Sequence, residues 1–483
     1  MSVNSLPTST PSSEGVDAHA VMGFVDALEA TNGVEPHSLM ILRHGSLVAS
    51  GWWSPYAAER LQLLYSLSKS FTSTAIGFAA AEGLLSLDDP VVSYFPELDA
   101  GVTNARTRSM LVRHIAAMSS GHVEDTWQRA STSRPDDPVH GFLELPPEQD
   151  PGSVFAYNQS ATYTLATIVQ RVSGTTLTEY LRSRLLDPIG AGAVAWSQYP
   201  EGQDMGFTGL HATTETIARF GELYLRNGTW LGKQVLPVGW VDEATRQHIA
   251  TDTVTDPAVG EKPDWRQGYG FQFWRSRHGY RGDGAYGQYC MVLPELDVVV
   301  AIMGQSSDTQ ALLDIVWREL LPAFQESPLS DATADQHLEE RMAGLTLSPS
   351  NADATAPADT DRWVDAQFSP AGGNCPEQPS LQRVGITATP DGWQVVLHEH
   401  DAKLSVPLGN SWSVGHWDDE PAPVFASGGW NDSDTIRAEL IFVETPHRLI
   451  VQCELTSRCF TATWITEPRG SSTLRALSAP RVR

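Results

Sequence analysis

Two strand-like regions lie far apart in the chain, with helical patterns between them. Residues 38–49 form two β-type apolar runs around His44, a pattern typical of a hairpin. Residues 268–274, 288–293 and 298–302 again favour strands. Because strands need partners, we expect the two regions to pair in one mixed sheet that carries the middle of the chain as a helical insertion. The fold class expected is therefore α/β (α+β).

Helical spacing of apolar residues fills the remainder of this first region. The predicted helices are 16–30, 66–81, 165–172, 177–186, 213–227 and 309–324. We expect a single domain over residues 16–325, with the helical insertion at about 85–205. Residues 1–15 are rich in Ser, Thr and Pro and are expected to be a flexible lead-in.

The pattern changes after residue 325. Residues 326–360 are rich in Ala, Asp, Ser, Thr and Pro, which predicts a linker, partly helical around 337–342. Residues 361–483 alternate apolar and polar positions, which predicts an antiparallel β barrel or sandwich. Trp417 and Trp430 in its loops either reach across as apolar lids or pack within their own domain.

Charge excludes several partners. The 483 residues include 58 Asp and Glu but only 32 Lys and Arg, a formal charge of −26, which repels nucleic acid and anionic membrane surfaces. No apolar stretch approaches the roughly 20 residues that span a bilayer, and the N-terminal residues lack a signal-peptide pattern. We expect a soluble, cytoplasmic protein, and a homo-oligomer is left open.

The sharpest chemical signal is a serine followed three residues later by a lysine. Ser66 and Lys69 open the helix predicted at 66–81, so their side chains share one helix face. A serine hydroxyl needs a neighbour to take its proton, and burial lowers a lysine pKa enough for that task. The chain has only four lysines, and the other three, Lys233, Lys262 and Lys403, have no serine at this spacing.

This motif and five later segments together resemble a known family. The segments are 64–74, 82–91, 112–121, 151–159, 209–221 and 284–294. They resemble the serine β-lactamase and penicillin-binding-protein superfamily. The likeness is closest to its class C-like branch of esterases, D-aminopeptidases and 6-aminohexanoate-dimer hydrolases, and it covers about residues 16–325. It implies a β-lactamase-like mixed sheet with Ser66 as nucleophile and Lys69 as base.

The second family motif is Tyr-x-Asn, and the resemblance places its tyrosine at Tyr157. Its role would be to carry a proton between Lys69, Ser66 and the leaving group. The third position is Gln159 instead of Asn, so the amide has a longer reach.

The third family motif, Lys-Thr-Gly or a variant, aligns with Gly282-Asp283-Gly284. No cation stands at Gly282, although another register would bring His278 or Arg281 nearer. This departure argues against an efficient β-lactamase or a transpeptidase, and favours substrates without a carboxylate next to the scissile bond. The resemblance also implies an oxyanion hole from the backbone amides of Ser66 and Ala285.

From these motifs we expect a serine hydrolase that acts on small esters or amides through an acyl-enzyme, with no cofactor and no metal. The alternatives are an acyltransferase, a D-amino-acid peptidase or weak β-lactamase, and a sensor that is acylated without turnover. His398 and His400 share a strand-like segment and are expected on one face, but no third metal ligand stands out.

Overall fold

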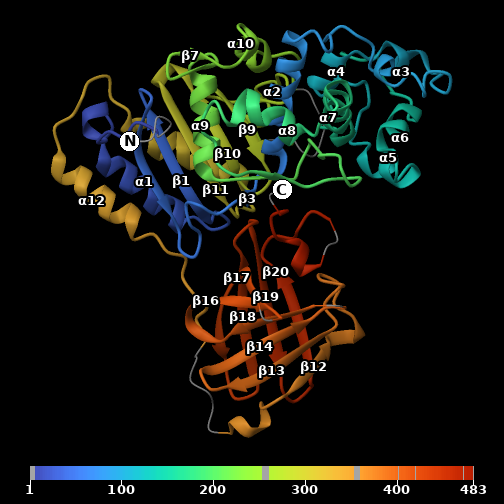
Figure 1. Ribbon diagram of the computed structural model, residues 1–483. Helices are drawn as coiled ribbons and strands as arrows, with labels where there is room; N and C mark the ends of the chain where they lie inside the picture. Colours follow the sequence, from blue (N-terminus) through green and yellow to red (C-terminus); the bar gives the residue numbers. More distant parts are fainter. Residues whose placement is uncertain are drawn as a thin grey trace.

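The chain forms an α/β body and a C-terminal β barrel (Figure 1). The computed structural model describes residues 6–252, 260, 262–352, 359–400, 402–418, 420–470 and 473–481. Residues 1–5 of the expected lead-in and 353–358 of the expected linker lie outside this described part. The expected fold class, a mixed α/β unit followed by an all-β domain, is confirmed.

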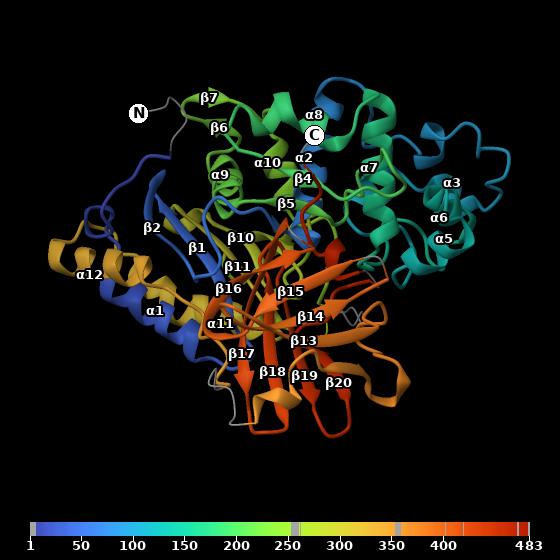
Figure 2. The same ribbon diagram turned by 60° about the horizontal axis from the view of Figure 1, so that its bottom comes forward.

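The body is built on a six-stranded sheet in the order β2-β1-β11-β10-β9-β8. The strands are β1 (Pro36–Arg43), β2 (Ser46–Trp52), β8 (Trp274–Arg275), β9 (Tyr280–Gly284), β10 (Gln288–Leu293) and β11 (Val298–Gly304). The hairpin β1–β2 pairs through β1 with β11, so the two distant strand regions meet as expected (Figures 1 and 2). Every residue of β1, β10 and β11 is buried, which makes them the centre of the core.

The strand expected at 268–274 is largely wrong. Only Trp274 and Arg275 form a strand there, as β8. Gly268 has φ 95° and Gln272 has φ 62°, so the chain turns where a strand would need extended backbone. The alternating aromatic residues that suggested a strand lie in this turn and are buried within the body.

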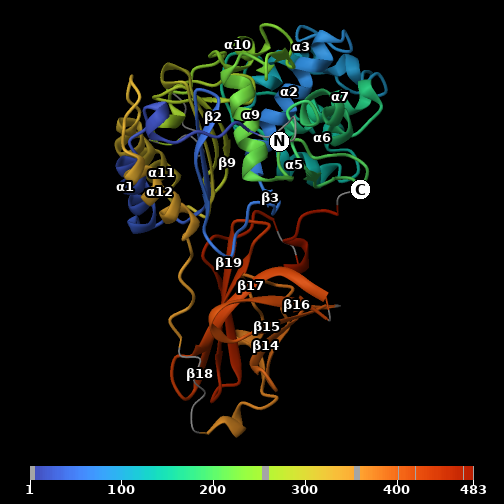
Figure 3. The same cartoon turned by 60° about the vertical axis from the view of Figure 1, so that its left-hand side comes forward.

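Helices cover both faces of the sheet, as Figure 3 shows. One face carries α1 (Ala18–Ala30), α11 (Thr309–Ile315) and α12 (Ala332–Ala343), and the other carries α2 (Ser68–Ala81) and α9 (Thr214–Leu225). The insertion contains α3 (Ala105–Ser109), α4 (Val112–Ala116), α5 (Trp127–Ser133), α6 (Pro138–Glu144), α7 (Gln159–Ser173) and α8 (Leu177–Leu181). The remaining elements of the body are β3 (Gln62–Leu63), β4 (Ala195–Trp196), β5 (Leu210–Ala212), β6 (Thr229–Trp230), β7 (Lys233–Gln234) and α10 (Trp240–Thr245).

The expected lead-in and linker both contribute to the body. In α12 the apolar residues Ala334, Leu338 and Met342 recur every four positions and are buried in the main core. Ser12 donates its backbone N–H to Asp335 of the same helix at 3.0 Å, which holds the lead-in against α12. A partial helix was expected around 337–342, and the helix observed there extends from Ala332 to Ala343. The polar composition that predicted a linker had concealed its buried face.

The barrel consists of nine strands. They are β12 (Gln367–Pro370), β13 (Arg383–Thr389), β14 (Gly392–His398), β15 (Lys403–Pro407), β16 (Gly409–Trp417), β17 (Glu420–Trp430), β18 (Thr435–Phe442), β19 (His447–Glu454) and β20 (Cys459–Trp464). A parallel pairing of β12 with β20 closes the barrel, and its other pairings are antiparallel. Trp417 and Trp430 are only 6% and 4% exposed within the barrel's own core. The idea that they act as lids is therefore wrong.

The barrel docks on the body through the turn between β18 and β19. Ile441 and Val443 belong to the core of the body. Leu63 of β3 donates its N–H to the carbonyl of Glu444 at 2.9 Å, and Arg448 pairs with Glu35 at 3.1 Å. The contact therefore includes shared core packing as well as polar bonds, and it lies next to the strand that leads to Ser66.

Candidate active site

Ser66 lies in a 3-10 turn, Tyr65–Leu67, that leads into α2. Tyr65 has φ 49°, a left-handed conformation that is uncommon for an aromatic residue and marks local backbone strain. In the first turn of a helix the backbone N–H groups have no intrahelical acceptor. The turn thus presents the half-buried Ser66 hydroxyl together with an amide available to an oxyanion.

Lys69 is buried, with 1% of its surface exposed. Its Nζ lies 3.1 Å from Ser66 Oγ, 2.6 Å from Gln159 Oε1 and 2.8 Å from the carbonyl oxygen of Phe207. Burial lowers the pKa of Lys69 from 10.5 to about 7, although the charge of Asp125 opposes this shift.

The contacts of Lys69 also orient it. The amide oxygen of Gln159 and the carbonyl of Phe207 can only accept hydrogen bonds. A neutral amine has two N–H groups, and these two acceptors engage both of them. Its lone pair then faces the remaining neighbour, Ser66 Oγ. Neutral Lys69 is therefore held in the orientation that a base for the Ser66 hydroxyl requires.

Tyr157 precedes α7, whose first residue is Gln159 and whose N-cap is Asn158. The Tyr157 ring lies 4.8 Å from Lys69 Nζ, and its side chain hydrogen-bonds with Ser66. Burial raises the pKa of the Tyr157 phenol well above its usual value, more than the bond to Ser66 lowers it. The hydroxyl is therefore protonated at neutral pH and can pass on a proton but is no resting base.

Two neighbouring serines, Ser68 and Ser70, are alternative candidates for the nucleophile, but both hydroxyls donate to backbone carbonyls. Ser68 Oγ donates to the carbonyl of Tyr65 at 2.6 Å, and Ser70 Oγ donates to the carbonyl of Gln272 at 2.9 Å. Both side chains are fully buried, at 0% and 1% exposure. Of these three serines, Ser66 is the one that contacts the lysine.

Strand β9 carries the expected third motif and lies directly against the Ser66 turn. A Cβ at Gly282 would stand 2.2 Å from Leu67 Cδ1, and one at Gly284 would stand 2.2 Å from the carbonyl oxygen of Leu64. Glycine at these positions is what lets the strand approach the turn so closely. A longer side chain at Gly282 would meet the start of α2, which explains why no lysine or histidine stands there.

The alternative alignment of the third motif, which would bring His278 or Arg281 nearer, also supplies no free cation. Arg281 is fully buried, and it donates to Asp283 at 2.9 Å and to Ser276 Oγ at 2.5 Å. His278 packs against Trp317, with 5.1 Å between the ring centroids. Burial raises the pKa of Asp283, although Arg281 opposes the shift. Arg281 is therefore engaged with Asp283 and Ser276 and is not available to bind a substrate carboxylate.

Ala285 follows β9 directly, and Tyr286 follows Ala285 with φ 65°. The close packing of β9 on the Ser66 turn brings the segment after Gly284 beside that turn. The rings of Tyr286 and Tyr65 meet edge to face at 5.5 Å. This places the Ala285 and Ser66 segments side by side, as an oxyanion hole formed by their two amides would require.

The barrel supplies two contacts that the sequence did not indicate. Tyr65 OH lies 2.5 Å from His447 Nε2, and His447 Nδ1 lies 2.9 Å from the carbonyl of Thr466. A carbonyl only accepts, so Nδ1 carries the proton and Nε2 accepts from Tyr65. Burial lowers the pKa of His447 to about 4, which keeps this ring neutral at pH 7. Tyr286 OH in turn donates to the carbonyl of Glu467 at 2.5 Å.

Asp125 is a third residue that sequence reasoning missed. Its carboxylate accepts the backbone N–H of Gln159 at 2.9 Å and raises the pKa of Lys69. It lies in the insertion, about 60 residues from Ser66. No spacing rule connects Asp125, His447 or Thr466 to the S-x-x-K motif, so nothing in the sequence could have identified them.

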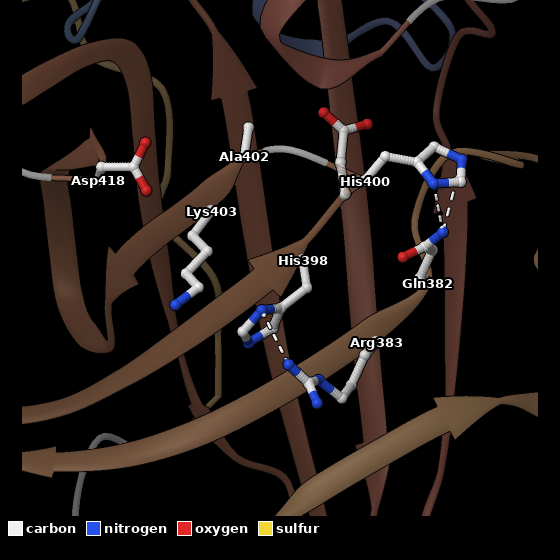
Figure 4. Close-up of a pocket in the computed structure, with 8 residues that line it drawn as sticks. Gln382, Arg383, His398, His400, Ala402, Lys403 and Asp418 are labelled. Atoms are coloured by element: carbon white, nitrogen blue, oxygen red, sulfur yellow. Dashed lines mark hydrogen bonds between the residues drawn. The ribbon is translucent and has the colours of Figure 1, made fainter.

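A polar pocket of about 610 Å³ lies on the barrel and contains His398 and His400 (Figure 4). The expectation that the two imidazoles share one face is wrong, because β14 ends at His398. His398 contacts Arg383, and His400 contacts Gln382 on another side (Figure 4). Across the residues with described positions, no three His, Cys, Asp or Glu side chains form a metal-binding group.

Among the helices in the described ranges, none combines the length and the apolar character needed to cross a bilayer.

Comparisons with known proteins agree with this geometry. The Beta-lactamase family model matches residues 23–322. The 6-aminohexanoate-dimer hydrolase of Paenarthrobacter ureafaciens is 28% identical over 291 residues, which are 56% of this chain and 73% of that protein. The beta-lactamase of Escherichia coli K12 is 26% identical over 327 residues, 56% of this chain and 82% of that protein.

A solved structure shows the same fold. A penicillin-binding-protein homologue from Caulobacter crescentus superposes with a TM-score of 0.51 at 16% identity, covering 64% of this chain and 97% of that one. The matched residues lie in the α/β body and include the S-x-x-K serine and lysine. The chain therefore belongs to the Beta-lactamase family and is a serine hydrolase of the β-lactamase-like superfamily.

Proposed function

We propose that this protein hydrolyses small esters or amides through an acyl-enzyme on Ser66. The observation that carries the proposal is the environment of Lys69, buried with a pKa of about 7 and with Nζ 3.1 Å from Ser66 Oγ. A base with a pKa near the working pH is the most effective kind. The esterase and amide-hydrolase names among its relatives agree with this chemistry.

Acylation begins when neutral Lys69 takes the proton of the Ser66 hydroxyl. Ser66 Oγ then forms a bond to the substrate carbonyl carbon, and the carbonyl oxygen becomes an oxyanion. The amides of Ser66 and Ala285 would stabilise that charge. When the tetrahedral intermediate collapses, the bond to the leaving group breaks. Tyr157 gives its proton to the leaving oxygen or nitrogen and regains one from Lys69.

Deacylation reverses the roles. Water takes the place of the leaving group, loses a proton through Tyr157 to Lys69, and attacks the acyl carbon. When this second intermediate collapses, the bond between Ser66 Oγ and the acyl carbon breaks, Lys69 returns the proton to Ser66 Oγ, and the acid product is released. Gln159 holds Lys69 in place during both half-reactions by accepting one of its N–H groups at 2.6 Å.

The test is covalent labelling with a fluorophosphonate probe. The wild-type protein should be labelled at a single serine, and Ser66→Ala should not be labelled. Ser68→Ala is the matched control, because Ser68 lies two residues away and its hydroxyl bonds to backbone. Labelling that survives in Ser66→Ala, or that disappears in Ser68→Ala alone, would contradict the assignment.

Turnover of a p-nitrophenyl ester separates the remaining functions. Sustained release of p-nitrophenol indicates a hydrolase, whereas a single stoichiometric burst indicates an acylated sensor. Adding an alcohol or an amine tests for acyl transfer. A hydrolase with promiscuous acyltransferase activity is among the fold neighbours, with a TM-score of 0.50, and its 16% identity shows likeness of fold alone. A faster release with formation of the new ester or amide would favour an acyltransferase.

A further inference from the structure

A short segment of the barrel, residues 466–469, lies beside the candidate active site. It follows β20, and two of its backbone carbonyls are bonded: that of Thr466 to His447 and that of Glu467 to Tyr286. The guanidinium of Arg469 lies 5.7 Å from the centroid of the Tyr286 ring. Because Tyr286 follows Ala285, these contacts place Arg469 next to the proposed oxyanion hole.

The charge of Arg469 is directed at the site and not at another protein group. Its side chain is exposed, and within the described part of the chain it makes no ion pair and no side-chain hydrogen bond. Its positive charge acts on Lys69, Tyr157, Tyr65 and His447. The guanidinium is therefore near the two proposed proton carriers while its donors face solvent.

The charge of the protein and the packing of β9 both indicate that an anionic substrate would need a cation from elsewhere. The protein carries a formal charge of −26, which repels an anionic substrate. Strand β9 has no room for a cation at Gly282, and Arg281 is buried and engaged with Asp283. An arginine presents five N–H donors in a planar fork that matches a carboxylate. Among the described residues whose positive charge acts on Lys69, Arg469 is the one with an unpaired guanidinium group.

We propose that Arg469 binds a carboxylate of the substrate, so that the barrel supplies the cation that β9 lacks. This inference rests on the function proposed above and names the substrate class: esters or amides that carry a carboxylate. It differs from the expectation, drawn from Gly282, that substrates lack a carboxylate next to the scissile bond, and the experiment below decides between the two. The carboxylate belongs to either the acyl or the leaving part of the substrate, and both parts are tested.

The experiment compares each acid with its own methyl ester. The acyl-side pair is the mono-p-nitrophenyl ester of adipic acid and the methyl ester of that compound. The leaving-side pair is the acetyl ester of para-hydroxybenzoate and its methyl ester. Each is assayed with the wild type, Arg469→Gln, Arg469→Lys and Arg458→Gln. Arg458 is a matched control, since it is a barrel arginine 6.0 Å from the Phe368 ring and has no part in the pKa shift of Lys69.

With one of the two acids, Arg469→Gln should raise KM about tenfold, which corresponds to about 1.4 kcal/mol of binding. The kcat of that acid and both constants of its methyl ester should change less than twofold. Arg469→Lys should recover part of the loss because it keeps the charge, and Arg458→Gln should match the wild type. Equal changes for acid and methyl ester in both pairs would overturn the inference. Loss of Ser66 labelling in the wild type would instead overturn the proposed function.

Discussion

The α/β body and the barrel contribute to the active site in different ways. The body supplies Ser66, Lys69 and Tyr157, the proposed nucleophile and proton carriers. The barrel supplies His447, which bonds to the residue before Ser66, and Arg469, whose charge reaches Lys69. The chemistry is thus concentrated in one helix start and its neighbour α7, while positioning and charge come from about 400 residues further along the chain.

This difference shows that a local motif can specify a reaction without specifying its substrate. Ser66 and Lys69 are three residues apart, so the helix alone places them together. The bond from Tyr65 to His447 spans 382 residues and depends on how the barrel docks. We therefore expect substitutions in the body to affect the rate for every substrate, and substitutions in the barrel to have smaller effects that depend on geometry or substrate.

The largest effect is expected for Lys69. Lys69→Ala removes the base and should lower kcat/KM by roughly 10²–10⁴-fold, the usual contribution of general base catalysis. The loss should be of similar size for p-nitrophenyl esters with and without a carboxylate. Lys262→Ala is the comparison, because this lysine lies over the Trp265 ring and outside the Ser66 contacts. A rate near that of the wild type would remove Lys69 from the mechanism.

The next effect is a dependence on pH. Burial lowers the pKa of Lys69 to about 7, and only the neutral amine accepts a proton. The neutral fraction therefore rises as the pH rises through 7, and kcat/KM should increase about tenfold from pH 6 to pH 8 before it levels off. The measurement is initial rate against pH for a neutral ester. A profile that keeps rising about tenfold per pH unit up to pH 10 would show that the pKa of Lys69 is not lowered in this way.

The smallest of these effects tests the barrel. Tyr65→Phe removes only the hydroxyl that bonds to His447 and should lower kcat by about two- to tenfold, since a net hydrogen bond contributes about 0.5–1.5 kcal/mol. Tyr56→Phe is a matched control, because Tyr56 also bonds to the barrel, at the carbonyl of Thr445, but does not adjoin Ser66.

If both tyrosine variants lose the same activity, docking of the barrel alone accounts for the effect and the turn has no special role. KM separates the two contributions of the barrel, because loss of the Tyr65–His447 bond should appear in kcat and loss of Arg469 in KM. A measurement of the thermal midpoint for each variant detects any general loss of stability.

Much of the fold could be predicted, because the apolar patterns that define it are local. The hairpin at β1 and β2, helix α2 and the all-β C-terminal domain all follow from residue spacing. The failures have physical causes of two kinds. Positive φ angles at Gly268 and Gln272 turned an apparent strand into a loop. A polar surface hid the buried face of α12, so a packed helix resembled a linker.

The candidate site also contains residues that the sequence could identify and residues that it could not. Ser66, Lys69, Tyr157 and Gln159 could be named because their spacing matches a family pattern, and the structure brings all four together. Their roles remain predictions until the variants are measured. Asp125, His447 and Arg469 could not be named, since each reaches the site only through tertiary packing. The burial of Trp417 and Trp430 could not be predicted either, because it depends on the closed barrel.

The bond between Tyr65 and His447 also has a consequence for biosynthesis. A ribosome makes the chain from its N-terminus, and domains fold in that order as they emerge. Ser66 and Lys69 are complete early, but His447 is added 382 residues after Tyr65. The nascent body can therefore form its sheet and α2 while the turn that presents the nucleophile still lacks its partner. Full hydrolytic competence would then appear only after translation of the barrel.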